Sequence, residues 1–253
     1  SNDTDCNASE AAFEECMGLD MGLNQIEHAG QYRAGAMATM TAQPILRGET
    51  GADTTAAQLE HTGLISDTRC TFLHNLVWSQ LNNSVMFDPG YWWVTNLAVR
   101  QGPDSTTSNG CHEVYSPFST FLTNIPLSNG LYVNAAPTVS ASTTVRAIGQ
   151  KDLTNKRAHL WVQNRKHTWC GVVGAVTNCQ QTWDDSALTG TITVSGFTNS
   201  ATYDLIWTTF DENGVATVQS PTTVVANGSG IITLDLDPLA DTVVDAAAKI
   251  GSY

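Results

Sequence analysis

The chain has 253 residues, enough for one large domain or two of ordinary size, and 42% of them are hydrophobic, which excludes a disordered protein. The formal net charge of −13 repels nucleic acid and anionic membranes, and no apolar run approaches the roughly 20 residues that cross a bilayer, so we expect neither nucleic-acid binding nor membrane insertion. Only 14% of the residues are charged, so the polar surface must be mostly Thr, Ser, Asn and Gln, which suits an extracellular protein that handles neutral polar ligands.

The first half of the chain is predicted to alternate strands with helices. Residues 21–40 lack Pro and favour a helix, and residues 43–49 predict a short apolar strand that ends in Glu49. A polar loop follows over residues 51–63. Ser66 or Asp67 is expected to cap a second helix, whose apolar residues have i, i+4 spacing on one face: Phe72, Leu73, Leu76, Val77 and Leu81.

The alternation continues to about residue 128. Residues 85–87 predict another short strand, Asp88-Pro89-Gly90 predicts a turn, and the aromatic run Tyr91-Trp92-Trp93 follows. Residues 114–122 predict a last helix with Pro117 in its first turn. We therefore expect residues 1–128 to form an α/β unit.

The second half, residues 129–253, is predicted to be a separate all-β domain. Its apolar residues alternate with polar ones, as in residues 191–194, 203–207 and 232–236, which is typical of strands with one buried face. Asn213-Gly214 is a strong hairpin turn signal. Several short strands at this spacing indicate a β-sandwich.

The six cysteines form an even number and contain no C-x-x-C pair, which argues against zinc or thioredoxin-like chemistry. Cys6 lies near Cys16 in the sequence and Cys170 near Cys179, which leaves Cys70 and Cys111 to pair. We expect these three disulfides in a secreted protein; the alternative is six buried free thiols in a cytosolic one.

Four N-x-S/T sequons also favour a secreted or cell-surface glycoprotein, although such triplets arise by chance. Ser1 opens a polar segment, so any targeting sequence is expected to be removed or to lie outside this chain. The candidate glycosylation sites are Asn2, Asn7, Asn82 and Asn227.

Several segments together resemble the C-terminal part of secreted, cellulase-like glycoside hydrolases with a retaining (β/α)8 barrel and an appended all-β domain. The segments are residues 43–49, the His74-Asn75-x-x-Trp78 motif, Tyr91-Trp92-Trp93, residues 115–118 with Phe121, and residues 160–169 at the entry to the β domain. The resemblance covers roughly residues 40–250. It implies the C-terminal portion of a (β/α)8 barrel in residues 1–128, followed by the β-sandwich.

The resemblance also assigns site residues. Glu49 corresponds to the nucleophile, and Trp92 or Trp93 to an aromatic platform that stacks on a sugar ring. Thr50 and Val94 depart from the family pattern, which has an aromatic residue and an Asp at these places. His74 either orients the Glu49 segment toward substrate or forms a buried polar pair with Asn75.

The barrel half that carries the acid/base glutamate has no counterpart in the chain, because a complete barrel needs about 250 residues. We therefore expect another chain or segment to complete it. Glu60 and Glu113 are predicted to be solvated charges rather than the missing acid. No metal or cofactor is expected, because the histidines lack metal-ligand spacing and no Gly-rich phosphate loop occurs.

Three functions fit these observations. The first is a retaining glycosidase that acts on or binds a β-linked polysaccharide, provided that the missing half is supplied. The second is a non-catalytic extracellular structural or adhesive protein on a degenerate hydrolase scaffold. The third is a carbohydrate-binding module, whose exposed tryptophans would come from Trp161, Trp169, Trp183 and Trp207. The strand alternation, however, places at least Trp207 in the core.

Overall fold

The computed structural model describes part of the chain, and the fold below concerns these residues only. They are residues 45–46, 69–81, 86–87, 111–141, 144–165, 167, 187–237, 239 and 243–253. Most of their regular secondary structure is antiparallel β-sheet, and the described α-helices are α4 (Thr71–Ser79) and α6 (Tyr115–Leu122). None of the described helices is long and apolar enough to cross a membrane.

A large sheet forms the centre of the described structure. Its strands follow the order β10-β8-β12-β6-β5-β3, and β9 pairs with β8 beside β10. β12 lies between β6 and β8, with antiparallel register on both sides. The bounds are β3 (Tyr132–Asn134), β5 (Val145–Asp152), β6 (Arg157–Asn164), β8 (Thr202–Phe210), β9 (Ala216–Val218), β10 (Thr222–Val225) and β12 (Asp245–Ile250).

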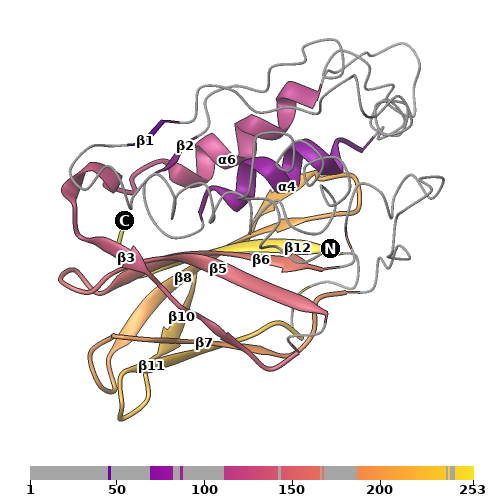
Figure 1. Cartoon of the computed structure of the whole chain (residues 1–253). Coiled ribbons are helices and arrows are strands. Elements are labelled where there is room, and N and C mark those ends of the chain that lie inside the picture. Colours follow the sequence, from indigo (N-terminus) through magenta and orange to yellow (C-terminus); the bar gives the residue numbers. More distant parts are fainter. Residues whose placement is uncertain are drawn as a thin grey trace, which may run out of the picture.

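A small sheet covers one face of the large one, below it in Figure 1. It has the order β11-β7-β4, with β4 (Thr138–Val139), β7 (Thr191–Ser195) and β11 (Ile231–Asp235). Alternate residues of both sheets meet in one core, whose buried members include Leu160, Val162, Ile192, Val194, Ile232, Leu234, Ala246 and Ala248. The alternation predicted for the second half is therefore present, and the described residues 187–237 contain no helix.

Helices cover the opposite face of the large sheet (Figure 1). The 3-10 turn η2 (Cys111–Val114) leads into α6, and α4 packs beside both. Trp78 of α4 fills the centre of this layer, with its ring centroid 5.1 Å from Phe118, 5.2 Å from Phe121 and 5.0 Å from Phe210. Residues on the covered face of the sheet, such as Trp161 and Ala247, belong to the same buried cluster. A second 3-10 turn, η3 (Leu127–Asn129), connects the layer to β3.

The expected fold of α/β followed by all-β, with a barrel portion in residues 1–128, is wrong for the described residues. Their helices do not surround a parallel barrel but lie on an antiparallel sheet. The short strands β1 (Ile45–Leu46) and β2 (Met86–Phe87) do pair in parallel, as two residues against two. The periodicity predicts helices where α4 and α6 lie, but their apolar faces are buried by the outer face of the sandwich. Periodicity shows that one side of a helix is buried and does not identify the burying surface.

Helix boundaries also differ from the sequence expectation. The N-cap of α4 is Cys70, three or four residues after the predicted caps, and it has the left-handed conformation at φ 56°. α6 begins at Tyr115, so Pro117 lies in its first turn as predicted. The predicted hairpin is confirmed: Gly214 has φ +71°, and the loop joins the antiparallel strands β8 and β9.

Candidate functional site

Most residues selected from the sequence lie outside the described part of the chain. This holds for Glu49, Trp92 and Trp93, for the glycosylation candidates Asn2, Asn7 and Asn82, and for Cys6, Cys16, Cys170 and Cys179. Their proposed roles stay predictions. Asn227 is described, and it is exposed in the turn before β11, where its Oδ1 accepts hydrogen bonds from the backbone of Ser229 and Ile231.

Cys70 is disulfide-bonded and buried at the start of α4. The cysteine bonded to it is not among the side chains that the structure describes. The predicted partner, Cys111, is the first residue of η2, which packs against α4. The Cys70–Cys111 pairing therefore stays a prediction that agrees with the position of these two elements.

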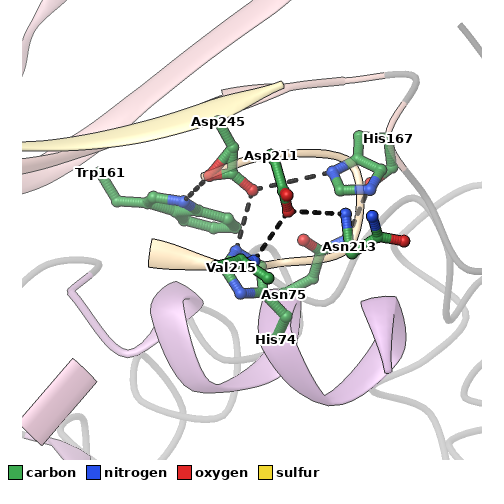
Figure 2. Close-up of polar contacts among 8 residues, drawn as sticks. All are labelled: His74, Asn75, Trp161, His167, Asp211, Asn213, Val215 and Asp245. Carbon is green, nitrogen blue, oxygen red and sulfur yellow. Dashed lines mark hydrogen bonds and ion pairs between the residues drawn. The ribbon is translucent and has the colours of Figure 1, made fainter. Parts of the chain in front are cut away.

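The polar cluster that the structure does reveal lies between α4 and the large sheet, and it centres on Asp245 at the start of β12 (Figure 2). Asp245 is fully buried. The indole Nε1 of Trp161 donates to its Oδ1 at 2.8 Å, and Nε2 of His74 donates to its Oδ2 at 2.9 Å. His74 is 171 residues away in sequence, so this hydrogen bond links the helical layer directly to the sheet.

The Asp245 carboxyl is held in its ionised form. Burial raises its pKa, but the charge and hydrogen bond of His74, together with His167, outweigh burial and lower the pKa to about 2. An ionised carboxylate only accepts hydrogen bonds, so His74 must carry its proton on Nε2. His167 Nδ1 lies 3.8 Å from Oδ2, beyond hydrogen-bond distance but close enough for electrostatic attraction.

Asn75 provides a second polar link from α4. Its Nδ2 donates to the backbone oxygen of His167 at 2.9 Å, and both residues are buried. Two consecutive residues of α4 therefore contact different parts of the chain. His74 binds Asp245 of β12, and Asn75 binds His167 in the segment after β6. This agrees with the interpretation of His74 and Asn75 as a buried polar pair, and substrate contact by His74 stays a prediction.

The β8–β9 hairpin lies beside the same cluster (Figure 2). Asp211 shapes its turn, because its Oδ1 accepts from the backbone nitrogens of Asn213 and Val215, each at 2.9 Å. A Cβ atom on Gly214 would lie 3.8 Å from Nδ1 of His74, so the turn reaches the imidazole of α4. Arg69 pairs with Glu212 at 3.5 Å on the surface above it.

The chemistry of this cluster is structural. Asp245 cannot touch a dissolved substrate because no part of it is exposed, and among the described residues no hydroxyl or thiol is hydrogen-bonded to His74 as a nucleophile would be. No group of three or more His, Cys, Asp or Glu in the described part could hold a metal ion. The observed contacts of the cluster join α4 to β12 and to the segment after β6.

An open groove of about 380 Å³ lies nearby, between α6 and the strands β8 and β9. Its walls are mostly apolar and include Pro117, Phe121, Ile206 and Val218. Lys249 also lines it, but the ammonium donates to the backbone oxygen of Thr123 at 2.9 Å. The described lining therefore lacks the paired carboxyl groups that glycoside hydrolysis requires.

Sequence reasoning missed Asp245, although its signal was present. It is the one charged residue among apolar neighbours in residues 243–248, and a lone carboxylate inside a buried strand needs hydrogen-bond donors. Trp161, a candidate for a sugar-binding face, is completely buried, so it presents no flat ring to a glycan in this structure. Trp207 is only 8% exposed, which confirms its predicted place in the core.

Comparisons with known proteins do not assign the site. No protein-family model matches the chain, and a search of curated proteins gives no match.

Proposed function

We propose that this chain is an extracellular, glycoside hydrolase-like protein that binds or acts on a β-linked polysaccharide, and that its β-sandwich is a non-catalytic support for the segment that carries Glu49, Trp92 and Trp93. The sugar-directed part rests on the resemblance of residues 43–49, 74–78 and 91–93 to that class of enzymes. The supporting role rests on the contact between Asp245 and His74.

That contact is the observation that carries the proposal. A buried carboxylate on β12 binds the helix whose place in the chain is between β1 and β2. Removing either partner leaves a buried charge or donor without its bond, so the sandwich and α4 are held in one arrangement. A catalytic segment needs such fixed support, because small misplacements of reacting groups are costly.

The two short strands limit where the proposed sugar-binding residues can lie. β1 and β2 are parallel, with Leu46 opposite Phe87, so both strands end at the same edge of the pair. Glu49 follows Leu46 by three residues and Trp92 follows Phe87 by five. A chain extends at most roughly 3.5 Å per residue, which keeps Glu49 within roughly 10 Å and Trp92 within roughly 18 Å of that edge.

In this proposal Trp92 or Trp93 stacks on the apolar face of a sugar ring and Glu49 is the nucleophile. Cleavage also needs a second carboxyl group roughly 5 Å from Glu49 as the acid/base. The proposal assigns that group to another chain or segment, since Glu113 is exposed on η2. The chain by itself is then expected to bind polysaccharide and not to cleave it.

Titration with soluble mixed-linkage β-glucan, xylan, mannan and xyloglucan tests the proposal. We expect at least one to bind, and we expect the double substitution Trp92→Ala, Trp93→Ala to weaken that binding about tenfold, the value of one lost aromatic contact. Glu49→Gln should keep the binding, and Glu113→Gln is the matched exposed-carboxylate control. A folded chain that binds none of the four polymers would overturn the proposal.

That negative result would favour the second candidate, a structural or adhesive protein. The specific observation for it is the complete burial of the Asp245 carboxylate, the central group of the described cluster. Such a protein would lose stability on substitution at Asp245 or His74 while showing no ligand-dependent change in melting temperature.

A further inference from the structure

A second titratable group lies between the layers, and nothing in the proposed function uses it. His159 of β6 is completely buried, and neither ring nitrogen has a hydrogen-bond partner among the described residues. Its ring centroid is 5.0 Å from Tyr132 of β3 and 6.5 Å from Phe121 of α6. A neutral imidazole is therefore enclosed by aromatic rings from the sheet and the helical layer.

The charged groups around His159 oppose its protonation. Lys249 of β12 is directly opposite it in the register, and Gln150, which is uncharged, is opposite it on β5. Arg157 lies two residues earlier on the same face of β6. Asp152 of β5 lies on that face two residues after Gln150, and its oxygens already accept from Thr154 and Asn155. The residues of α6 carry no charge.

Neither Tyr132, which lies beside it, nor Tyr253, which packs against the same layer, compensates. Burial raises the pKa of Tyr132 and, much further, that of Tyr253, so both are neutral at acid pH. A proton on His159 would thus place a cation opposite Lys249, and no described carboxylate is hydrogen-bonded to the ring to balance it. Burying an unpaired charge is strongly unfavourable.

We propose that His159 makes the contact between the helical layer and the large sheet acid-sensitive, so that its protonation requires α6 to separate from β6 and β12 around it. This inference concerns the fold and does not depend on the sugar-binding proposal. His159 contrasts with His74 and His167, which face the Asp245 carboxylate rather than a lysine.

The pH range follows from linkage. Burial, with the charge of Lys249, lowers the pKa of His159 to about 3. A solvated histidine has a pKa of about 6.5, so between these values the separated state binds one proton more than the packed state. As the pH is lowered from about 6 to 4, the ratio of packed to separated molecules should then fall about tenfold for each pH unit. Asp245, with its pKa of about 2, adds to the pH dependence of packing only below about pH 4.

Hydrogen exchange of the full chain between pH 7 and 4 tests this directly, after correction for the intrinsic pH dependence of exchange. We expect protection in α6, residues 115–122, to fall with pH, while β7 and β11 of the small sheet stay protected. His159→Phe, which keeps an aromatic ring among Tyr132 and Phe121, should retain α6 protection at least tenfold better at pH 4.5. Equal loss of protection in both proteins would overturn the proposal.

A second measurement needs no variant at His159. In the wild-type protein, the imidazole carbon resonances of His159 should stay those of a neutral ring while α6 is packed. Lys249→Met removes the nearest cation and should move the loss of α6 protection to lower pH. A His159 ring that titrates near pH 6.5 with α6 still protected would contradict the inference, whatever the variants do.

Discussion

The two faces of the large sheet are both buried, but by different kinds of contact. The face toward the small sheet is apolar, with Leu160, Val162, Ala246 and Ala248 from the central strands. The face toward the helices alternates with it along the same strands and carries Trp161, His159, Asp245 and Lys249. The first face supplies hydrophobic burial without directional contacts, whereas the second holds its partner through a few polar groups whose geometry and ionisation matter.

The largest effect is expected on the polar face, from Asp245→Ala. It leaves the buried donors of Trp161 and His74 without an acceptor, so we expect a loss of about 3–5 kcal/mol in the free energy of unfolding, measured by denaturant titration. Asp245→Asn keeps the shape and is the matched control, with a smaller loss. A loss below about 1 kcal/mol for the alanine variant would mean that the cluster does not fasten the layers.

The apolar face should respond through cavity formation alone. Leu160→Ala is expected to cost about 3 kcal/mol, because Leu160 is completely buried between the sheets. The loss should be the same at pH 7 and pH 4.5, since no titratable group is removed. A loss that changes strongly with pH would contradict the prediction that only the polar face depends on ionisation.

Protonation of Asp245 should lower the stability of the polar face below about pH 4. The folded-state pKa of about 2 lies below the unfolded value of about 3.9, so the carboxylate stabilises the fold above pH 4 and this contribution is lost as the pH falls through 2. The difference corresponds to about 2–3 kcal/mol. Denaturant titrations from pH 5 to 2 should show a shallower decline for Asp245→Asn than for the wild type.

The smallest effect is expected at the edge of the polar face, in the hairpin near His74. Asp211→Ala removes two hydrogen bonds to the turn backbone, and Asp211 is partly exposed, so we expect a loss of about 1 kcal/mol. Asp235→Ala on β11 is a control, because it is exposed and accepts one turn hydrogen bond. A loss as large as that of Asp245→Ala would show that the turn, rather than the carboxylate, positions α4.

The sequence predicted the apolar face well and the polar face poorly, for physical reasons. Residues 191–194 and 231–235 alternate because one side of each strand meets the core, and the hairpin at Asn213-Gly214 follows from local backbone preference. The partner of α4 could not be read in this way. A helical pattern shows that one side is buried, and the residue that binds His74 lies 171 positions away.

The partners of Asp245, like the partner of α4, cannot be identified from the sequence. Its position among apolar residues predicts that it needs donors, yet nothing local identifies Trp161 or His74. The motif His74-Asn75-x-x-Trp78 was noticed for its resemblance to an enzyme segment. In the structure its three named residues are buried between the layers. Short motifs of polar and aromatic residues therefore serve packing as readily as catalysis.

The central position of β12 has a consequence for synthesis of the protein. A ribosome that has completed the chain only as far as residue 242 has made β6 and β8, but each still lacks the neighbour that β12 provides. Both nascent strands then expose unpaired edges, which are prone to wrong pairing. The helices made earlier also lack Asp245, Ala247 and Lys249 beneath them. This part of the molecule can assemble only after translation of β12, so the cell must keep the unfinished chain from aggregating until then.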